Sequence, residues 1–144
     1  MADDYPFLEF AEIHVDRLCL ELALDPTRYD VLVMENLFGD VLSDLCAGLV
    51  GGLGVVPGSN IGTRHAVFEA VHGSAPDIAG KGIANPIALI RSAALMLEHV
   101  GQPDVARRIE ASVRKTLASG LGLTGDLGGN GNTATMTERL IANL

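Results

Sequence analysis

A short β-branched run followed at once by a long apolar helix pattern limits the folds open to this chain more than any other feature. Residues 29–34 (YDVLVM) have the length and composition of a buried parallel strand. The next apolar residues, in 39–52 (GDVLSDLCAGLVGG), predict a helix that the pair Gly51–Gly52 ends. The expected buried stripe of this helix consists of Val41, Leu42, Leu45, Leu49 and Val50. A strand that leads directly into a helix indicates the α/β fold class.

Comparable patterns occur along the rest of the chain. Before residue 29 we expect a strand at 7–10 and a helix from Val15 to Asp25-Pro26. After residue 52 we expect a turn-rich connection at 54–62 and a strand at 66–71. Three helices should follow: one from Asn85-Pro86 to Gly101, one from Pro103 to Gly120, and a last one with a capping box in Thr135 and Glu138. The buried face of the helix after Pro86 is expected to hold Leu89, Ile90, Ala93, Leu97 and Val100. A parallel sheet of two or three strands leaves edges uncovered, so more chain or a partner is expected to complete it.

Composition excludes some classes of function. The chain has 144 residues, 48% of them hydrophobic, which suits one ordinary core. A formal net charge of -8 argues against a nucleic-acid partner and favours small-molecule ligands, anionic ones included where a metal supplies positive charge.

Cys19 and Cys46 lie in apolar helix patterns, so we expect buried free thiols, rather than a disulfide or metal pair, and a cytoplasmic chain. No export or membrane segment is indicated. An organellar origin stays open if a transit segment has been removed.

Two aspartates in the helix pattern form a candidate metal site. Asp40 and Asp44 stand at positions i and i+4, so both carboxylates project from one side of a helix, with their Cβ atoms about 6 Å apart. Their mutual repulsion costs a few tenths of a kcal/mol, and a hard cation such as Mg²⁺ or Mn²⁺ would reverse its sign. The alternative interpretation is that Asp40 caps the helix and Asp44 is solvated.

The loop from His72 to Asp77 (HGSAPD) lies between a strand and a helix, where α/β proteins commonly bind nucleotides. Gly73 permits close approach of the backbone to a ligand. Asp77 is suited to accept hydrogen bonds from a ribose diol and to repel a 2′-phosphate. A turn aspartate and a structural His72 are the alternatives. The GxGxxG fingerprint is absent, so an ordinary Rossmann site is not expected.

Two long motifs carry a family resemblance. Residues 36–54 (NLFGDVLSDLCAGLVGGLG) and 68–86 (FEAVHGSAPDIAGKGIANP) resemble the β-decarboxylating dehydrogenases, which include the isocitrate, isopropylmalate and homoisocitrate dehydrogenases. Within this family, DLCAGLVGGLG looks most like the NAD-dependent isocitrate dehydrogenases. The resemblance implies an α/β chain that is the C-terminal portion of a two-domain fold, with residues 1–50 ending the small, dimer-forming domain and 51–144 ending the large domain.

The resemblance also implies ligand sets. Asp40 and Asp44 would bind Mg²⁺ or Mn²⁺ together with Asp16 from a neighbouring subunit. The adenosine end of NAD would be lined by His72, Gly73, Ser74, Ala75, Asp77, Ile78 and Asn85. NADP-dependent relatives place Lys and Tyr at the positions of Asp77 and Ile78, and Tyr and Arg near Gly125 and Gly129, which favours NAD here.

The implied reaction is oxidation of isocitrate or another 2-hydroxy acid by hydride transfer to NAD⁺, with loss of CO₂. Regulatory subunits of such enzymes often lose the first aspartate of this helix, whereas this chain keeps Asp40, as catalytic subunits do. No catalytic residue is assigned, because Tyr5, Tyr29, Lys81 and Lys115 do not match the family's acid and base. The substrate-binding Ser/Arg cluster of the family also lies in the first half of the family's polypeptide, which this chain does not match.

Three interpretations follow. The chain is a truncated dehydrogenase, or half of a split enzyme, or a non-catalytic subunit that binds NAD or metal. The expected protein partners are further copies in a homo-oligomer, or a complementary chain that supplies the missing half. The chain by itself is expected to show weak or no dehydrogenase activity.

Overall fold

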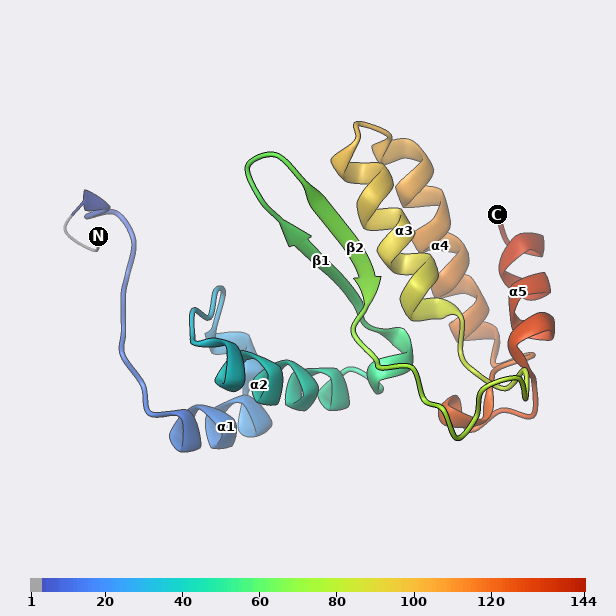
Figure 1. Ribbon diagram of the computed structural model, residues 1–144, viewed down its shortest axis with the longest axis horizontal. Helices are drawn as coiled ribbons and strands as arrows, with labels where there is room; N and C mark the ends of the chain where they lie inside the picture. The colour runs from blue at the N-terminus through green and yellow to red at the C-terminus, as the bar shows by residue number, and fades with distance from the viewer. Residues whose placement is uncertain (1–3) are drawn as a thin grey trace. The chain divides into compact units, whose positions relative to one another are not determined.

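The computed structural model describes residues 4–144, which divide into two compact units (Figure 1). The first unit ends at Cys46 and the second covers Ala47–Leu144. This division lies four residues before the domain boundary expected from the sequence. The assignment of the two parts to a small and a large domain stays a prediction.

The first unit is built on two helices, α1 (Val15–Leu24) and the larger part of α2 (Asn36–Leu49). A short 3-10 turn, η2 (Pro26–Arg28), follows α1 after the Asp25-Pro26 step that was expected to end it. The core of the first unit joins Leu18 and Leu22 of α1 to Leu42 of α2, and both cysteines pack against this cluster as free thiols. The helix spacing read from the sequence is therefore confirmed in α1, with Leu18 and Leu22 on the buried face.

Two expected strands are wrong. Residues 7–10 and 29–34 have no ladder partner in the described chain and form no β-structure. A strand exists only where its backbone groups pair with a neighbour, and composition alone cannot supply that neighbour. The side chains of Val31 and Val33 are 80% and 92% exposed, although their residue types suit a buried strand.

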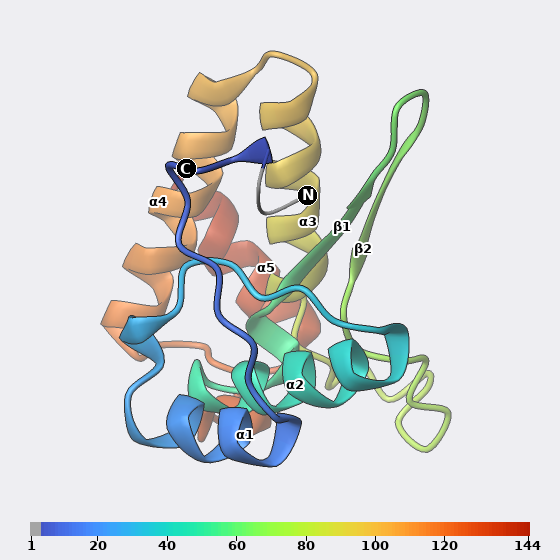
Figure 2. The ribbon, with the colours of Figure 1, turned by 90° about the vertical axis from the view of Figure 1, so that its left-hand side faces the viewer.

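The second unit contains a β-hairpin made of β1 (Pro57–Ile61) and β2 (Ala66–Ala70), shown from a second direction in Figure 2. The strands are antiparallel, with Pro57 opposite Ala70 and Ile61 opposite Ala66. The expected turn-rich connection at 54–62 is thus partly a strand, and the expected parallel arrangement is wrong for these two strands. Pro57 is compatible with a strand because it occupies the first position of an edge strand.

The hairpin packs against one helix through a buried serine. The hydroxyl of Ser92, on α3 (Ile87–His99), donates to the carbonyl of Glu69 at 2.7 Å, and the amide of Gly58 donates to the same hydroxyl at 3.3 Å. One hydroxyl thus contacts both strands and fixes them on α3. This residue was not singled out from the sequence, because the expected buried face of the helix was defined by its apolar side chains alone.

Three helices form the body of the second unit, and α3 lies between the hairpin and α4 (Pro103–Ser119) in Figure 1. The third, α5 (Thr133–Ala142), packs against α4. The core of this unit consists of Val55, Ile87, Val113, Met136 and Leu140. None of the helices in residues 4–144 is long and apolar enough to cross a membrane.

The helix ends follow the sequence more closely than the helix faces do. Gly101 and Gly120 adopt positive φ values of 81° and 66° where α3 and α4 end. The capping box of α5 is made by Asn132 and Thr135, not by Thr135 and Glu138, because the N-cap lies three residues earlier than expected.

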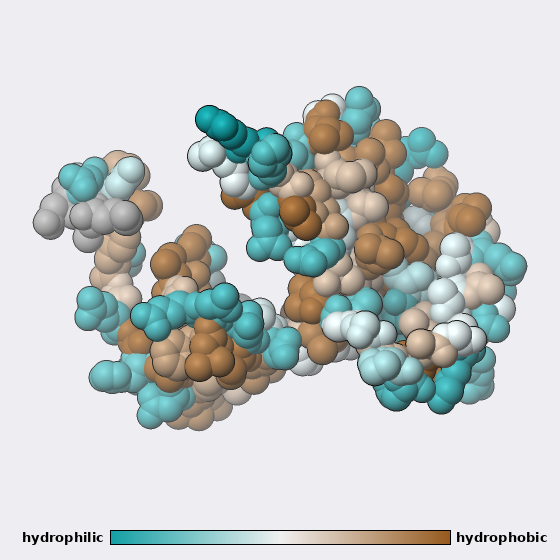
Figure 3. All heavy atoms as spheres, in the orientation of Figure 1, coloured by the Kyte–Doolittle hydropathy of each residue, from teal (hydrophilic) through white to brown (hydrophobic). Residues whose placement is uncertain are grey.

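The expected buried face of α3 is displaced: Leu89 and Val100 are exposed, whereas Ile87, Ala88, Ser92 and Ala94 are buried. In α2, Leu42 and Ala47 are buried but Val41 and Leu49 are exposed, as is Val50 just after the helix. Apolar atoms accordingly lie on the visible surface of each unit (Figure 3).

Candidate functional site

The two predicted metal aspartates lie on the exposed surface of α2. The helix begins at Asn36, so Asp40 is in its second turn and does not cap it. This removes the capping interpretation of Asp40. Both side chains are exposed, and within residues 4–144 no Lys, Arg or His side chain forms an ion pair with either of them. Two unpaired carboxylates at i and i+4 supply hard oxygen ligands of the kind that Mg²⁺ and Mn²⁺ prefer.

Asp16 lies in the first turn of α1, where its Oδ1 accepts a hydrogen bond from the amide of Arg17 at 2.8 Å. In the described part of the chain, no three His, Cys, Asp or Glu side chains come close enough to hold a metal ion. One copy therefore offers two neighbouring carboxylates and a third on another helix. The involvement of Asp16 from a second copy stays a prediction.

A carboxylate network supports α1 beside Asp16. Glu21 accepts hydrogen bonds from the Tyr29 hydroxyl, from Arg17 Nε at 2.6 Å and from Arg28 Nη1 at 3.3 Å. The hydrogen bond from Tyr29, followed by the one from Arg17, lowers the pKa of the Glu21 carboxyl below its ordinary value. The same bond to Glu21 raises the pKa of the Tyr29 hydroxyl. This network ties the segment after η2 back onto α1.

The predicted cofactor loop runs from His72 to Asn85 between β2 and α3, as expected. Ala75 has a φ of 43°, which is uncommon for a residue with a side chain and lies beside the predicted ribose ligand Asp77. The amide of Ile78 donates to the carbonyl of Ala75 at 3.1 Å, which closes a turn around Asp77. The carboxylate of Asp77 is exposed at the tip of that turn. His72, Gly73 and Ser74 are exposed as well, and His72 Nδ1 lies 2.9 Å from the carbonyl of Gly73.

Asn85 differs from the rest of the loop because its side chain is held at both ends. Its Oδ1 accepts from the amide of Ile87 at 2.9 Å, and its Nδ2 donates to Asp126 Oδ2 at 2.9 Å. Asp126 lies in η4 (Gly125–Leu127), far along the sequence, and sequence reasoning did not mark it. Its only signal was its place in the glycine-rich run LTGDLGGNGN, which was considered for its glycines.

The same glycine-rich segment leaves no room for a side chain at Gly129. An added Cβ there would lie 2.0 Å from the carbonyl oxygen of Leu123. The backbone in this conformation therefore excludes a basic side chain at Gly129.

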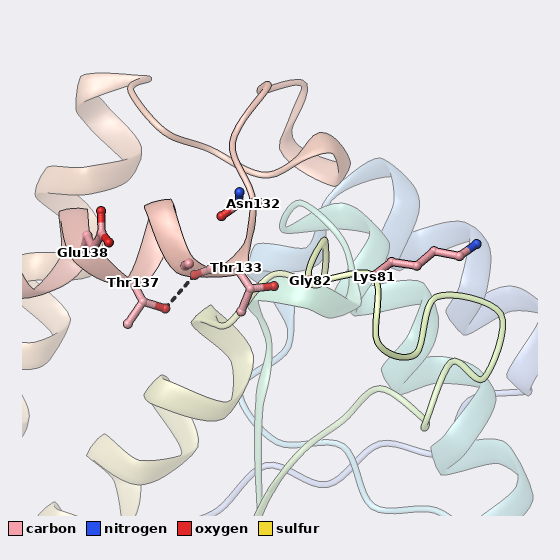
Figure 4. A pocket seen from close by; sticks show the side chains of 7 residues that line it. Lys81, Gly82, Asn132, Thr133, Thr137 and Glu138 are labelled. Carbon is pink, nitrogen blue, oxygen red and sulfur yellow. Dashed lines mark hydrogen bonds between the residues drawn. The ribbon is translucent and has the colours of Figure 1, made fainter.

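A shallow hollow lies where the end of the loop meets α5 (Figure 4). Thr133 borders it and holds the loop, since its amide donates to the carbonyl of Gly82 at 2.8 Å and its hydroxyl donates to the carbonyl of Ala84 at 2.5 Å. The side chain of Lys81 points away from the hydroxyls of Thr133 and Thr137 in this view. Lys81 nevertheless belongs to the residues that line the hollow, together with Glu138.

The comparison with known families agrees with the motifs. The family model described as isocitrate/isopropylmalate dehydrogenase matches residues 1–140. The chain belongs to the isocitrate/isopropylmalate dehydrogenase family. The resemblance inferred from residues 36–54 and 68–86 is thereby confirmed.

Individual relatives make the relationship more specific. Over 138 residues the chain is 55% identical to the probable isocitrate dehydrogenase (NAD) subunit alpha, mitochondrial, of Caenorhabditis elegans, covering 96% of this chain and 38% of the relative. It is 53% identical over 141 residues to the human mitochondrial subunit alpha, covering 97% and 38%. The crystal structure of isocitrate dehydrogenase from Methylococcus capsulatus matches with 54% identity and a TM-score of 0.94, covering 99% of this chain and 42% of that one.

These relatives test the expected fold class and the expected cellular compartment, and they show how much of the whole enzyme this chain covers. The α/β class, as part of the isocitrate/isopropylmalate dehydrogenase fold, is confirmed. The expectation of a cytoplasmic chain is wrong, because the curated relatives are mitochondrial proteins. Free cysteines indicate only a reducing compartment, and the cytosol is one of several. The chain spans 38% of the length of these curated relatives, so the ligand sets and the whole enzyme's activity are taken up as proposals.

Proposed function

We propose that this chain supplies the metal- and NAD-binding portion of a mitochondrial NAD-dependent isocitrate dehydrogenase. The observation that carries the proposal is that two neighbouring exposed carboxylates, Asp40 and Asp44, form no ion pair. Both lie in the part of the chain that the family model matches. The relatives named above support isocitrate as substrate and NAD as cofactor. The proposed reaction oxidises the hydroxyl of isocitrate by hydride transfer to NAD⁺, releases the β-carboxylate as CO₂ and protonates the resulting enol.

The metal portion would consist of Asp40 and Asp44 from one copy and Asp16 from another. When bound there, a divalent cation supplies positive charge that polarises the oxygen of the developing carbonyl. The protein's own contribution is to hold the two carboxylates one helical turn apart without a competing cation. Their repulsion in the free chain favours a cation over a neutral ligand. Because one copy holds an incomplete ligand set, metal binding would couple to association of two copies or of two chains.

The cofactor portion would be the loop His72–Asn85. Asp77, at the tip of a turn, would accept hydrogen bonds from the two ribose hydroxyls of the adenosine half, and its negative charge would disfavour a 2′-phosphate. Gly129 strengthens this preference, since no basic side chain fits at that position to bind such a phosphate. Both features favour NAD over NADP.

The groups that move protons would come from outside this chain. Tyr5, Tyr29, Lys81 and Lys115 remain unassigned as acid or base, and Tyr29 is engaged with Glu21. We therefore expect the purified chain to make little or no NADH. Robust Mg²⁺- and isocitrate-dependent NADH production by the 144-residue chain alone would contradict this part of the proposal.

Two alternatives remain within the family and beyond it. An isopropylmalate or homoisocitrate dehydrogenase fragment would share the metal and NAD portions, and a non-catalytic subunit would bind NAD or metal without turnover. The test is to isolate the native protein with any bound chain from its own cells and to assay NADH production with each of the three 2-hydroxy acids. Activity with isocitrate alone supports the proposal. Activity with another acid, or NAD binding by calorimetry without any turnover, supports the corresponding alternative.

A further inference from the structure

The side chain of Asn85 is fixed in one orientation by two different partners. Its carbonyl oxygen accepts from the amide of Ile87, which starts α3, and its amino group donates to the carboxylate of Asp126. Each partner can bond to only one end of the Asn85 side chain. The Ile87 N–H is a donor and needs the carbonyl oxygen, whereas the Asp126 carboxylate is an acceptor and needs the amino group. A flip of the amide would break both hydrogen bonds at once.

The Asp126 carboxylate and the Asn85 side chain lie close to the backbone of Gly54. A Cβ added to Gly54, in η3 (Leu53–Val55), would lie 2.7 Å from Asp126 Oδ2 and 3.2 Å from both Cβ and Nδ2 of Asn85. The carboxylate therefore occupies the space that a side chain at position 54 would need. Three segments far apart in the sequence meet at this point.

A second contact from the same C-terminal region holds the loop nearby. Thr133 donates through its amide to Gly82 and through its hydroxyl to Ala84. The last residues of the loop are thus fastened at Gly82, Ala84 and Asn85. The stretch from His72 to Asp77 is also exposed, and none of these three contacts involves it. Residues 72–77 therefore lie between β2 and a segment that these contacts hold.

We propose that Asp126 is a positioning residue for NAD binding, acting through Asn85 and the loop that Asn85 ends. This inference rests on the proposed NAD site in residues 72–85, and Asp126 itself belongs to no ligand set inferred above. The carboxylate acts by selecting one orientation of the Asn85 amide. A side chain at position 54 would displace the carboxylate from its present position.

The test exchanges the two partners. Asn85→Asp keeps an oxygen that accepts from the Ile87 amide, but it places a second carboxylate next to that of Asp126. Combining it with Asp126→Asn puts an amino donor at position 126 and so restores the hydrogen bond between the two positions. Asp126→Ala removes the partner, and Asp30→Ala, an exposed aspartate in the other unit, is the control with the same charge change. NAD affinity is measured by calorimetry on the full chain together with any chain that co-purifies with it. Hydrogen exchange is followed across residues 72–85.

We expect Asp126→Ala and Asn85→Asp each to weaken NAD binding about 5- to 20-fold, a span of roughly 1–2 kcal/mol. Exchange in residues 72–85 should become faster, while the unfolding midpoint of the second unit stays unchanged. The double exchange should recover most of the affinity, and Asp30→Ala should have no effect. Unchanged affinity in Asp126→Ala, or no recovery in the double variant, would overturn the inference.

Failure of the proposed NAD site gives a different result. If the unaltered protein binds no NAD, the proposed cofactor site is wrong. Hydrogen exchange still decides whether Asp126 positions the loop, since faster exchange in Asp126→Ala and its reversal by the partner exchange need no cofactor.

Discussion

Replacing Asp44 by Asn should reverse its effect on stability according to whether a divalent metal is present. The substitution keeps the shape and nearly the same helix propensity but removes one of two like charges at i and i+4. Such a pair destabilises a helix by about 0.2–0.5 kcal/mol, and exposure of both side chains puts α2 at the lower end of that range. In the metal-free chain, Asp44→Asn is therefore expected to stabilise the fold by roughly 0.2–0.3 kcal/mol.

The sign changes when the cation is added. A ligand present at tenfold its Kd stabilises the state that binds it by about 1.4 kcal/mol. The unaltered chain should gain this amount from Mn²⁺, and the Asp44→Asn variant should gain much less because one of its carboxylates is gone. The variant would thus be the more stable protein in EDTA and the less stable one in Mn²⁺.

The assay is urea unfolding followed by circular dichroism at low ionic strength, with and without Mn²⁺. Transition midpoints are compared because they are measured more precisely than extrapolated free energies. Asp30→Asn is the control, as an exposed aspartate away from the pair. A loss of stability in EDTA on replacing Asp44 would refute the reasoning, since it would mean that the carboxylate makes a stabilising contact in the folded chain. Equal Mn²⁺ stabilisation of both proteins would refute it too.

Further predictions concern the core, the α1 network and the cofactor loop. Ile87→Ala should destabilise the second unit by about 2–5 kcal/mol, measured by urea unfolding, because Ile87 is fully buried. Since the folded-state pKa of Glu21 is lowered, its stabilisation of α1 is complete above its unfolded pKa and is lost as pH falls through the lowered value. Tyr29→Phe should reduce that acid sensitivity in a circular dichroism titration, and an unchanged profile would contradict the network. Asp77→Asn should improve NADP binding relative to NAD about fivefold by calorimetry, since removing one charge relieves roughly 1 kcal/mol of repulsion.

The helices were predictable because their signals are local. The i, i+4 spacing in α1, the proline at the start of α4 and the glycines after α3 and α4 each act within a few residues. The strand expected at 66–71 is confirmed as β2 (Ala66–Ala70). The strand expected at 29–34 is wrong, since these residues have a strand's composition without a ladder partner in the described chain. The β1 strand was missed for the opposite reason, as its proline, glycine and asparagine resemble a turn until β2 pairs with them.

The candidate site divides in the same way. Asp40 and Asp44 were visible as a pair because helical spacing fixes their neighbourhood, and the cofactor loop was visible because it carries a long motif. Asp126 was not, because its contact with Asn85 joins residues 41 positions apart and depends on the folding of the segment between them. Long-range partners of this kind have no period or spacing in a single sequence.

The most direct measurement is NADH production by a chimera in which this chain replaces the matching segment of the Methylococcus capsulatus isocitrate dehydrogenase. With 54% identity over 99% of this chain, the two segments should exchange without loss of the fold. We predict isocitrate- and Mn²⁺-dependent NADH production by the chimera, and its loss by at least 100-fold when Asp40→Asn and Asp44→Asn are introduced together, about 3 kcal/mol of transition-state stabilisation. Metal-dependent NADH production that survives both substitutions would contradict the claim that this chain holds the metal.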